Sequence, residues 1–242
     1  MRSEFVHLHN HSDYSLLDGA QRIDQLVNTI DDLNMDSVAL TEHGNMFSVV
    51  PYYKKAKKAG IKPIIGCEIY VATGSRFDKN KSPDGGWGNN HLILLAQNFA
   101  GYKNLMKLVT AGYLEGFYYR PRIDMELLQK YSEGLICLSG CLKGEVPEKM
   151  LRGDYNGARK TAIKFSEIFE NRYYLEIQNH GIPEEEANIK NMKKLSMDLE
   201  LPLVCTNDAH YSKKGHWEAH DIHICLGTGK ERSDPKRLRY AT

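Results

Sequence analysis

The chain has 242 residues, of which 41% are hydrophobic and 26% are charged. This composition is ordinary for a globular protein, and the length suits one large α/β barrel or two small domains. The net charge of +1 excludes the broad basic field of many nucleic-acid-binding proteins, so any contact with DNA has to be local.

The sequence carries no sign of a membrane span or of secretion. No apolar run is long enough to cross a bilayer, and the N-terminal residues lead directly into a strand-like segment rather than a signal peptide. The five cysteines are scattered without a CxxC pair, which argues against a disulfide scaffold. We therefore expect a protein of the reducing cytoplasm without a membrane partner.

Seven short β-type runs recur along the chain, and most of them are followed by a helical pattern. Between the first two runs, apolar residues from Ile23 to Leu33 repeat at helical spacing, and those from Ile189 to Leu199 do so before the last run. Pro183 and the glutamates after it are start signals for that second helix. The seven runs are residues 5–9, 37–41, 63–71, 91–97, 135–139, 173–178 and 203–206.

Strands that alternate with helices predict a parallel sheet, and seven such units favour closure into a TIM-like α/β barrel. Gly60 and Gly134 stand just before strands, where helix-ending glycines are expected. We expect the barrel to cover residues 1–226, with a polar and basic tail at 227–242 that leads toward further chain. The polar loop at 74–90 is long enough to suggest a functional or flexible flap.

Candidate metal ligands stand at or near the ends of these runs. His9 and His11 lie at the first, and Asp208 and His210 follow the last. Alternate residues of a strand point to the same side, so the members of each pair can bind one ion together. The C-terminal ends of parallel barrel strands converge on one face. The other candidates are Asp18, Glu42, His43, Glu68, His91, Cys141, Glu176 and His180.

Imidazole, carboxylate and thiolate are the ligands of Zn²⁺ and similar ions. The candidates outnumber the ligands of one ion, which indicates a multinuclear site of the kind that hydrolyses phosphate esters. A single histidine or aspartate at a strand end is usually a cap or a solvent-facing group. A set that contains both an HxH and a DxH pair is hard to explain in that way.

The motifs HLHNHS, LTEHGN, KPIIGCE, HLILLA, LSGC and TNDAHY resemble, in order, those of the polymerase-and-histidinol-phosphatase (PHP) superfamily. The segments SLLDGA, GYKNLMKL and GTGKERSDP extend the resemblance to the PHP domains at the N-terminus of bacterial DNA polymerase III alpha subunits. The resemblance covers nearly the whole chain. It implies a distorted (β/α)7 barrel.

The resemblance also implies nine ligands for up to three ions, Zn²⁺ or Mn²⁺, and the thiolate of Cys141 favours Zn²⁺. His9, Glu68 and Asp208 are the residues on which hydrolysis is expected to depend most. In the family pattern His9, His11, Glu68 and Asp208 hold one ion, Glu68 bridges to a second held by His91 and Cys141, and Asp18, His43 and His210 hold the third.

The implied activity is 3′–5′ exonuclease proofreading at the 3′ end of a DNA primer. The implied partners are DNA, the remainder of a polymerase alpha chain and, as a candidate, a separate proofreading subunit of the epsilon type. One alternative is a stand-alone phosphatase of the histidinol-phosphate type, against which the polymerase-like segments argue. Another is a non-catalytic scaffold for the polymerase and its partners, against which the complete ligand set argues.

Several residues keep open roles. His7 shares a face with His9 and His11, but we interpret it as structural. His180 contacts either substrate or its own loop. His216, His220 and His223 have the spacing of one helix face, for which we favour a surface or packing role. Tyr118, Tyr119, Arg120 and Arg122 either follow a DNA backbone or pack a loop, while Cys67, Cys137, Cys205 and Cys225 are expected in the core.

Overall fold

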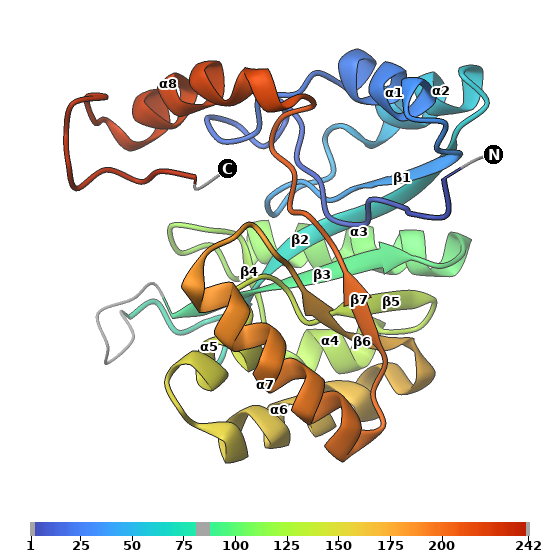
Figure 1. Ribbon diagram of the computed structural model, residues 1–242. Helices are drawn as coiled ribbons and strands as arrows, with labels where there is room; N and C mark the ends of the chain where they lie inside the picture. Colours follow the sequence, from blue (N-terminus) through green and yellow to red (C-terminus); the bar gives the residue numbers. More distant parts are fainter. Residues whose placement is uncertain (1–2, 81–87, 241–242) are drawn as a thin grey trace. The chain divides into compact units, whose positions relative to one another are not determined.

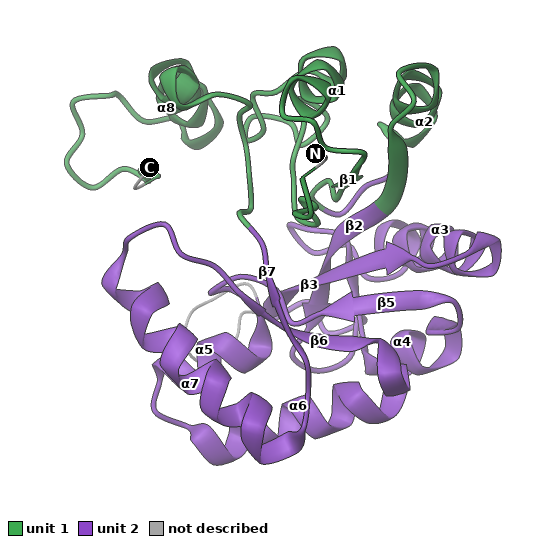
Figure 2. Ribbon diagram, turned by 45° about the vertical axis from the view of Figure 1, so that its right-hand side comes forward, with its two compact units in different colours: residues 1–43, 47–65, 207–242 green, residues 44–46, 66–206 purple. Residues whose placement is uncertain are grey.

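The computed structural model describes residues 3–80 and 88–240. The chain divides into two compact units (Figure 2). Unit 1 comprises residues 1–43, 47–65 and 207–242, and unit 2 comprises residues 44–46 and 66–206. The expected flap at 74–90 lies partly outside the described residues.

Unit 1 contains helices α1 (Ile23–Asp32), α2 (Val49–Lys58) and α8 (Trp217–Thr228), the 3₁₀ turn η2 (Lys214–His216), strand β1 (Ser37–Leu40) and the start of β2 (Lys62–Ala72) (Figure 1). Strands β1 and β2 pair in parallel. The apolar stripe predicted near residue 23 is the buried face of α1. It packs with residues of β1 and α2 into a core that includes Leu26, Val27, Ile30, Val38, Leu40, Tyr52 and Ala56.

The strand predicted at residues 5–9 is wrong, because within the described part of the chain this segment makes a single isolated parallel bridge, from His7 to Val38, and the next bridge, from Asn10 to Ala209, lies beyond it. Hydrogen bonds that involve side chains stand in for part of the backbone pairing that a regular strand would make here. The backbone amide of Asn10 donates to Thr41 Oγ1 (3.0 Å), and Asn10 Nδ2 donates to the carbonyl of Ala39 (3.0 Å). Such side-chain bonds compete with regular strand pairing.

Unit 2 holds most of the sheet. Beyond Ile65, β2 pairs with β3 (Asn89–Ala96), followed across the sheet by β5 (Leu135–Leu138), β6 (Tyr173–Ile177) and β7 (Leu203–Cys205), while β4 (Arg122–Ile123) also pairs with β2. The helices are α3 (Phe99–Leu114), α4 (Met125–Tyr131), α5 (Glu145–Leu151), α6 (Tyr155–Phe169), α7 (Pro183–Leu199) and the 3₁₀ turn η1 (Glu170–Arg172).

The expectation of a wholly parallel sheet is wrong, because β3 runs antiparallel to both β2 and β5. The register places Ala72 opposite Asn89, so β2 returns into β3 as a hairpin. Consecutive parallel strands need a crossover, usually helical, and the described residues 73–80 form no helix. The fold is therefore mixed α/β. Six of the seven predicted strands are present, and the structure adds the two-residue strand β4, which the sequence did not predict.

Local signals set the helix ends in unit 2. Pro183 is the first residue of α7, and three glutamates occupy its first turn, as predicted. Asp154 caps α6 by accepting a hydrogen bond from Gly157 N (2.8 Å). Gly134, with φ of 70°, permits the turn from α4 into β5. The core of unit 2 lies between its helices and sheet and includes Leu92, Leu94, Leu105, Leu128, Phe165, Phe169 and Leu195.

Three of the four cysteines predicted in the core are buried, namely Cys67, Cys137 and Cys225. The prediction is wrong for Cys205, which is exposed at the end of β7. The residue before it, Val204, is apolar, but adjacent residues of a strand face opposite sides. No described helix combines the length and the apolar character that a membrane span requires.

Arg122, on β4, packs a loop. Its side chain is only 2% exposed. The guanidinium donates to three backbone carbonyls, those of Gly116 (3.2 Å), Arg76 (3.4 Å) and Asp78 (2.7 Å). Of the two roles left open by the sequence, loop packing is therefore the one that this arginine performs, whereas Arg120 and Tyr119 are exposed.

We expect Arg122→Ala to lower the free energy of unfolding by about 2–4 kcal/mol, because three backbone carbonyls, two of them in buried hydrogen bonds, lose their charged donor. Urea denaturation measures the change. Arg120→Ala is the matched control and is expected to shift stability by no more than about 0.5 kcal/mol. Equal stability of the two variants would contradict this role for Arg122.

Candidate metal centre

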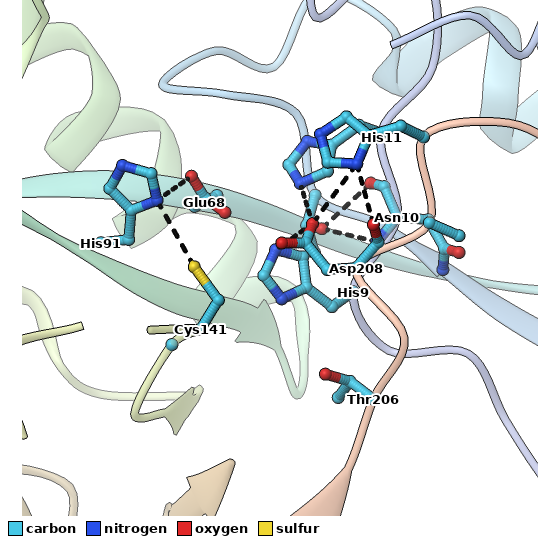
Figure 3. Close-up of polar contacts among 12 residues, drawn as sticks. His9, Asn10, His11, Glu68, His91, Cys141, Thr206 and Asp208 are labelled. Atoms are coloured by element: carbon cyan, nitrogen blue, oxygen red, sulfur yellow. Dashed lines mark hydrogen bonds and ion pairs between the residues drawn. The ribbon is translucent and has the colours of Figure 1, made fainter. Parts of the chain in front are cut away.

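Asp208 stands at the centre of a histidine cluster in unit 1 (Figure 3). His9 Nε2 and His11 Nε2 each lie 3.1 Å from Asp208 Oδ1, and His210 Nδ1 lies 3.7 Å from it. Burial by itself would raise the pKa of Asp208, but the charges of His9, His210 and His11 hold that pKa well below its usual range. The carboxylate is therefore ionised at neutral pH.

The backbone holds this cluster in place where the chain leaves β7. Asp208 has a φ of 45°, in the left-handed region that aspartate tolerates better than most residues. Directly after it, Ala209 N donates to the carbonyl of His9 (3.2 Å), and the carbonyl of Ala209 accepts from His11 N (2.9 Å). Gln21 Nε2 donates to the carbonyls of both His11 and Ala209. Both predicted ligand pairs, HxH and DxH, are thus fixed side by side.

A second set in unit 1 contains Asp18, His43 and His210, together with His11. Asp18 Oδ2 lies 2.9 Å from His43 Nε2, and Asp18 Oδ1 lies 3.7 Å from His210 Nε2. The rings of His43 and His210 both stack on that of His11, with centroids 3.9 Å and 4.5 Å away. Candidate ligand atoms of the three histidines all lie within 4.8 Å of one another. By geometry His11 therefore belongs to both sets in this unit.

The protonation states in this second set suit metal binding. Burial lowers the pKa of His210 to about 4, so its imidazole is neutral at pH 7. His210 Nδ1 lies 2.8 Å from the carbonyl of Asp208, to which a neutral ring donates its proton, leaving a lone pair on Nε2. Burial opposes ionisation of Asp18, yet its hydrogen bond with His43 and the positive charge that His210 gains in acid keep the pKa of Asp18 well below the usual range.

Unit 2 contributes a separate set of three ligands. Glu68, on β2, is fully buried, and its Oε1 lies 2.7 Å from Nδ1 of His91 on β3. Cys141 Sγ lies 3.9 Å from the same nitrogen (Figure 3). Candidate ligand atoms of these three residues lie within 4.8 Å of one another. All nine predicted ligands therefore stand in sets of mutually close donors within one unit or the other.

Two further carboxylates, which the sequence placed among the strand-end candidates, belong to no such set within the described residues. Glu42 is buried and accepts hydrogen bonds from Ser12 N (3.1 Å), Ser12 Oγ and Ser15 Oγ (2.5 Å). Ser15 Oγ also accepts from His43 N (3.0 Å). Glu42 therefore orders the loop that joins His11 to Asp18, a role that its position in the sequence does not reveal.

Glu176 has the equivalent role in unit 2. It is buried and accepts hydrogen bonds from Gly140 N (3.0 Å), Gln178 Nε2 (3.2 Å) and Thr206 Oγ1. The bond to Gly140 fixes the turn that presents Cys141. The sequence signal for such a role is a glutamate in an otherwise apolar strand. Such a glutamate is expected to be buried, and a buried carboxylate needs several hydrogen-bond donors from the segments around it.

Three histidines with open roles belong to none of the ligand sets. His7 is partly buried, and its Nδ1 has no hydrogen-bond partner among the described residues. His180 Nδ1 contacts Glu185 Oε1 at 2.6 Å, at the start of α7. His220, on α8, is buried, and its Nε2 lies 3.0 Å from the carbonyl of Asp18. Of the surface or packing role expected for His216, His220 and His223, packing thus applies to His220.

The donor chemistry fits divalent ions. Each set combines imidazole nitrogens with at least one nearby carboxylate, and the set of unit 2 adds a sulfur. In the set around Asp208, one carboxylate oxygen faces several imidazole nitrogens. This arrangement is expected around a cation, because the lone pairs of these oxygen and nitrogen atoms then point toward the position of the ion. Imidazole, carboxylate and thiolate together suit Zn²⁺ or a similar ion.

Comparison with known proteins identifies the family of this chain. The family model described as the PHP domain matches residues 7–180. DNA polymerase III subunit alpha of Borreliella burgdorferi is 50% identical over 241 residues, covering 100% of this chain and 21% of the relative. The subunit of the same name from Treponema pallidum is 48% identical over 242 residues, again covering 100% of this chain and 21% of the relative. The chain thus spans about one fifth of the length of these curated relatives.

Among solved structures, an amidohydrolase from Chromobacterium violaceum with bound sulfate superposes with a TM-score of 0.54 at 12% identity, covering 90% of this chain and 96% of that one. At this identity the likeness shows the fold alone. The match of the PHP model to most of the sequence carries the assignment, and this chain belongs to the PHP domain family.

Proposed function

We propose that this chain is the PHP domain of a bacterial DNA polymerase III alpha subunit and that it hydrolyses phosphodiesters at the 3′ end of DNA. The observation that carries the proposal is the pair of ligand sets, around Asp208 in unit 1 and around Glu68 in unit 2. Relatives named as the alpha subunit match the chain from end to end. The 3′ end of a primer is the substrate for proofreading, and DNA and the rest of the alpha chain are the partners.

The proposed centre binds up to three ions, Zn²⁺ or Mn²⁺. His9, His11, Glu68 and Asp208 form one site, Glu68 extends to a second with His91 and Cys141, and Asp18, His43 and His210 form a third. When bound, such ions acidify water and neutralise charge on phosphate oxygens.

The chain's own residues prepare the centre. Ionised Asp208 and Asp18 offset the positive charge of the ions, and neutral His210 offers a lone pair. Glu42 and Glu176 hold the loops that carry the ligands, so the donor atoms are positioned before an ion arrives. This preorganisation is the usual support of a catalytic metal site.

We expect Asp208→Asn to reduce hydrolysis of a 3′-mismatched primer by about a hundredfold or more, together with its metal content, because the carboxylate that faces three histidines loses its charge. Asparagine tolerates the left-handed backbone at this position, so the fold is retained. Primer degradation and elemental analysis of purified protein measure the two effects.

Asp31→Asn, at an exposed position of α1, is the matched control and leaves both quantities unchanged. Full activity of metal-loaded Asp208→Asn protein would refute the proposed centre. Hydrolysis of histidinol phosphate without hydrolysis of the primer would refute the assignment to DNA.

The second prediction concerns the choice of metal. Cys141→Ser removes the only thiolate of the proposed ligands, so we expect affinity for Zn²⁺ to fall by about 10–100-fold while affinity for Mn²⁺ changes less. Competition with a chromophoric chelator measures both affinities. Cys205→Ser, at the exposed cysteine of β7, serves as the control. An unchanged preference for Zn²⁺ would exclude Cys141 as a ligand.

A further inference from the structure

Unit 1 contains a cavity of about 360 Å³ between α8 and the chain that follows it. Its lining comes from Tyr211, from α8 and from residues 232–240. Pockets for small ligands typically measure about 300–1,000 Å³, so this cavity can hold a molecule of the size of a mononucleotide.

Ion pairs hold the wall of the cavity in place. Arg237 contacts the carboxylate of Asp221 on α8 through two nitrogens, with Nη2 2.8 Å from Oδ2. Its Nε donates to the carbonyl of Arg232 (3.0 Å), and Arg232 Nε lies 3.1 Å from Asp221 Oδ2. These contacts fix the chain after α8 against the helix. The cavity is therefore formed before a ligand enters.

The charge of the lining favours an anion. Arg232, Arg237 and Arg239 line the cavity, and Asp221 is its one acidic residue. Asp221 is occupied by the first two arginines. Arg239 forms no ion pair with a carboxylate among the described residues. Its guanidinium remains for a ligand phosphate, which arginine binds through two parallel hydrogen bonds.

Aromatic side chains line the same cavity. Trp217, the first residue of α8, leaves 47% of its surface exposed, and the guanidinium of Arg232 lies 6.0 Å from the centre of its ring. Tyr211 and Tyr240 also face the cavity. An exposed indole beside a cation is a platform on which nucleobases stack.

The cavity shares two residues with the neighbourhood of the ligand set around Asp18. The hydroxyl of Tyr240 donates to Asp18 Oδ1 (3.0 Å) and lies 3.3 Å from His210 Nε2. His220, which also lines the cavity, contacts the carbonyl of Asp18 through Nε2. A ligand in the cavity therefore lies directly beside the predicted metal ligands of unit 1.

We propose that this cavity binds a deoxynucleoside 5′-monophosphate, with the base on Trp217 and the phosphate on Arg239. The inference rests on the proposed hydrolysis of DNA, in which water cleaves the terminal phosphodiester, its oxygen joins the phosphorus and the shortened strand leaves with a 3′-hydroxyl. The released nucleotide carries the aromatic base and the anionic phosphate that the lining fits. The cavity is thus the subsite of the terminal nucleotide.

Isothermal titration of the 242-residue protein, in buffer containing a chelator, tests the site without any contribution from metal ions. We expect deoxyadenosine monophosphate to bind at least about tenfold more tightly than either inorganic phosphate or deoxyadenosine, since each of these keeps only half of the contacts. Trp217→Leu and Arg239→Ala are each expected to weaken binding by about tenfold.

Lys236→Ala is the matched control, because it removes one positive charge from the same segment at a position outside the lining. Circular dichroism and thermal melting establish that each variant is folded. Absence of binding to the folded wild type, or equal affinity in Trp217→Leu, Arg239→Ala and Lys236→Ala, overturns the proposal.

The two proposals fail separately. Hydrolysis of DNA by a protein that does not bind the monophosphate overturns the subsite and leaves the proposed function standing. Binding that depends on Trp217 and Arg239, in a protein that never hydrolyses DNA when loaded with Zn²⁺ or Mn²⁺, supports the cavity as a nucleotide site and overturns the exonuclease function.

Discussion

Burial of carboxylates is the constraint on which the organisation of this protein depends. A carboxylate removed from water is costly unless cations or several hydrogen-bond donors surround it. Asp208 meets the requirement with histidines, and Glu42 and Glu176 meet it with backbone amides and side-chain hydroxyl or amide groups. Each carboxylate therefore fixes the position of the segments around it, and those segments carry the candidate ligands.

The helices and strands form the rigid scaffold, and the irregular segments carry most of the candidate metal ligands. Glu68 and His91 lie on strands, but His9, His11, Asp18, Cys141, Asp208 and His210 lie where no regular ladder or helix exists. Such segments are free to turn a side chain inward, as the left-handed backbone of Asp208 shows. This division is common in enzymes, where loops on a stable scaffold carry the reactive groups.

Within unit 1, the ligand set around Asp18 and the proposed nucleotide cavity are adjacent and are connected by shared residues. Tyr240 and His220 contact Asp18 from one side, and both face the cavity from the other. The ion pair of Arg237 with Asp221 holds the segment that carries Tyr240. The residues after α8, which the sequence presents only as a polar tail, therefore contribute to the surroundings of the candidate metal centre.

The sequence by itself determined the elements with strong local signals, such as α1 and α7, six of the strands, and the residue types of the candidate ligands. Periodicity, caps and ligand chemistry are local properties, so they can be read along the chain. Only the tertiary structure decided that β3 runs antiparallel and that residues 5–9 form an isolated bridge rather than a strand. It also decided that Arg122 packs a loop and that Glu42 and Glu176 order the segments that carry ligands. These features depend on partners distant in sequence, because burial and hydrogen bonding are satisfied only when the chain has folded.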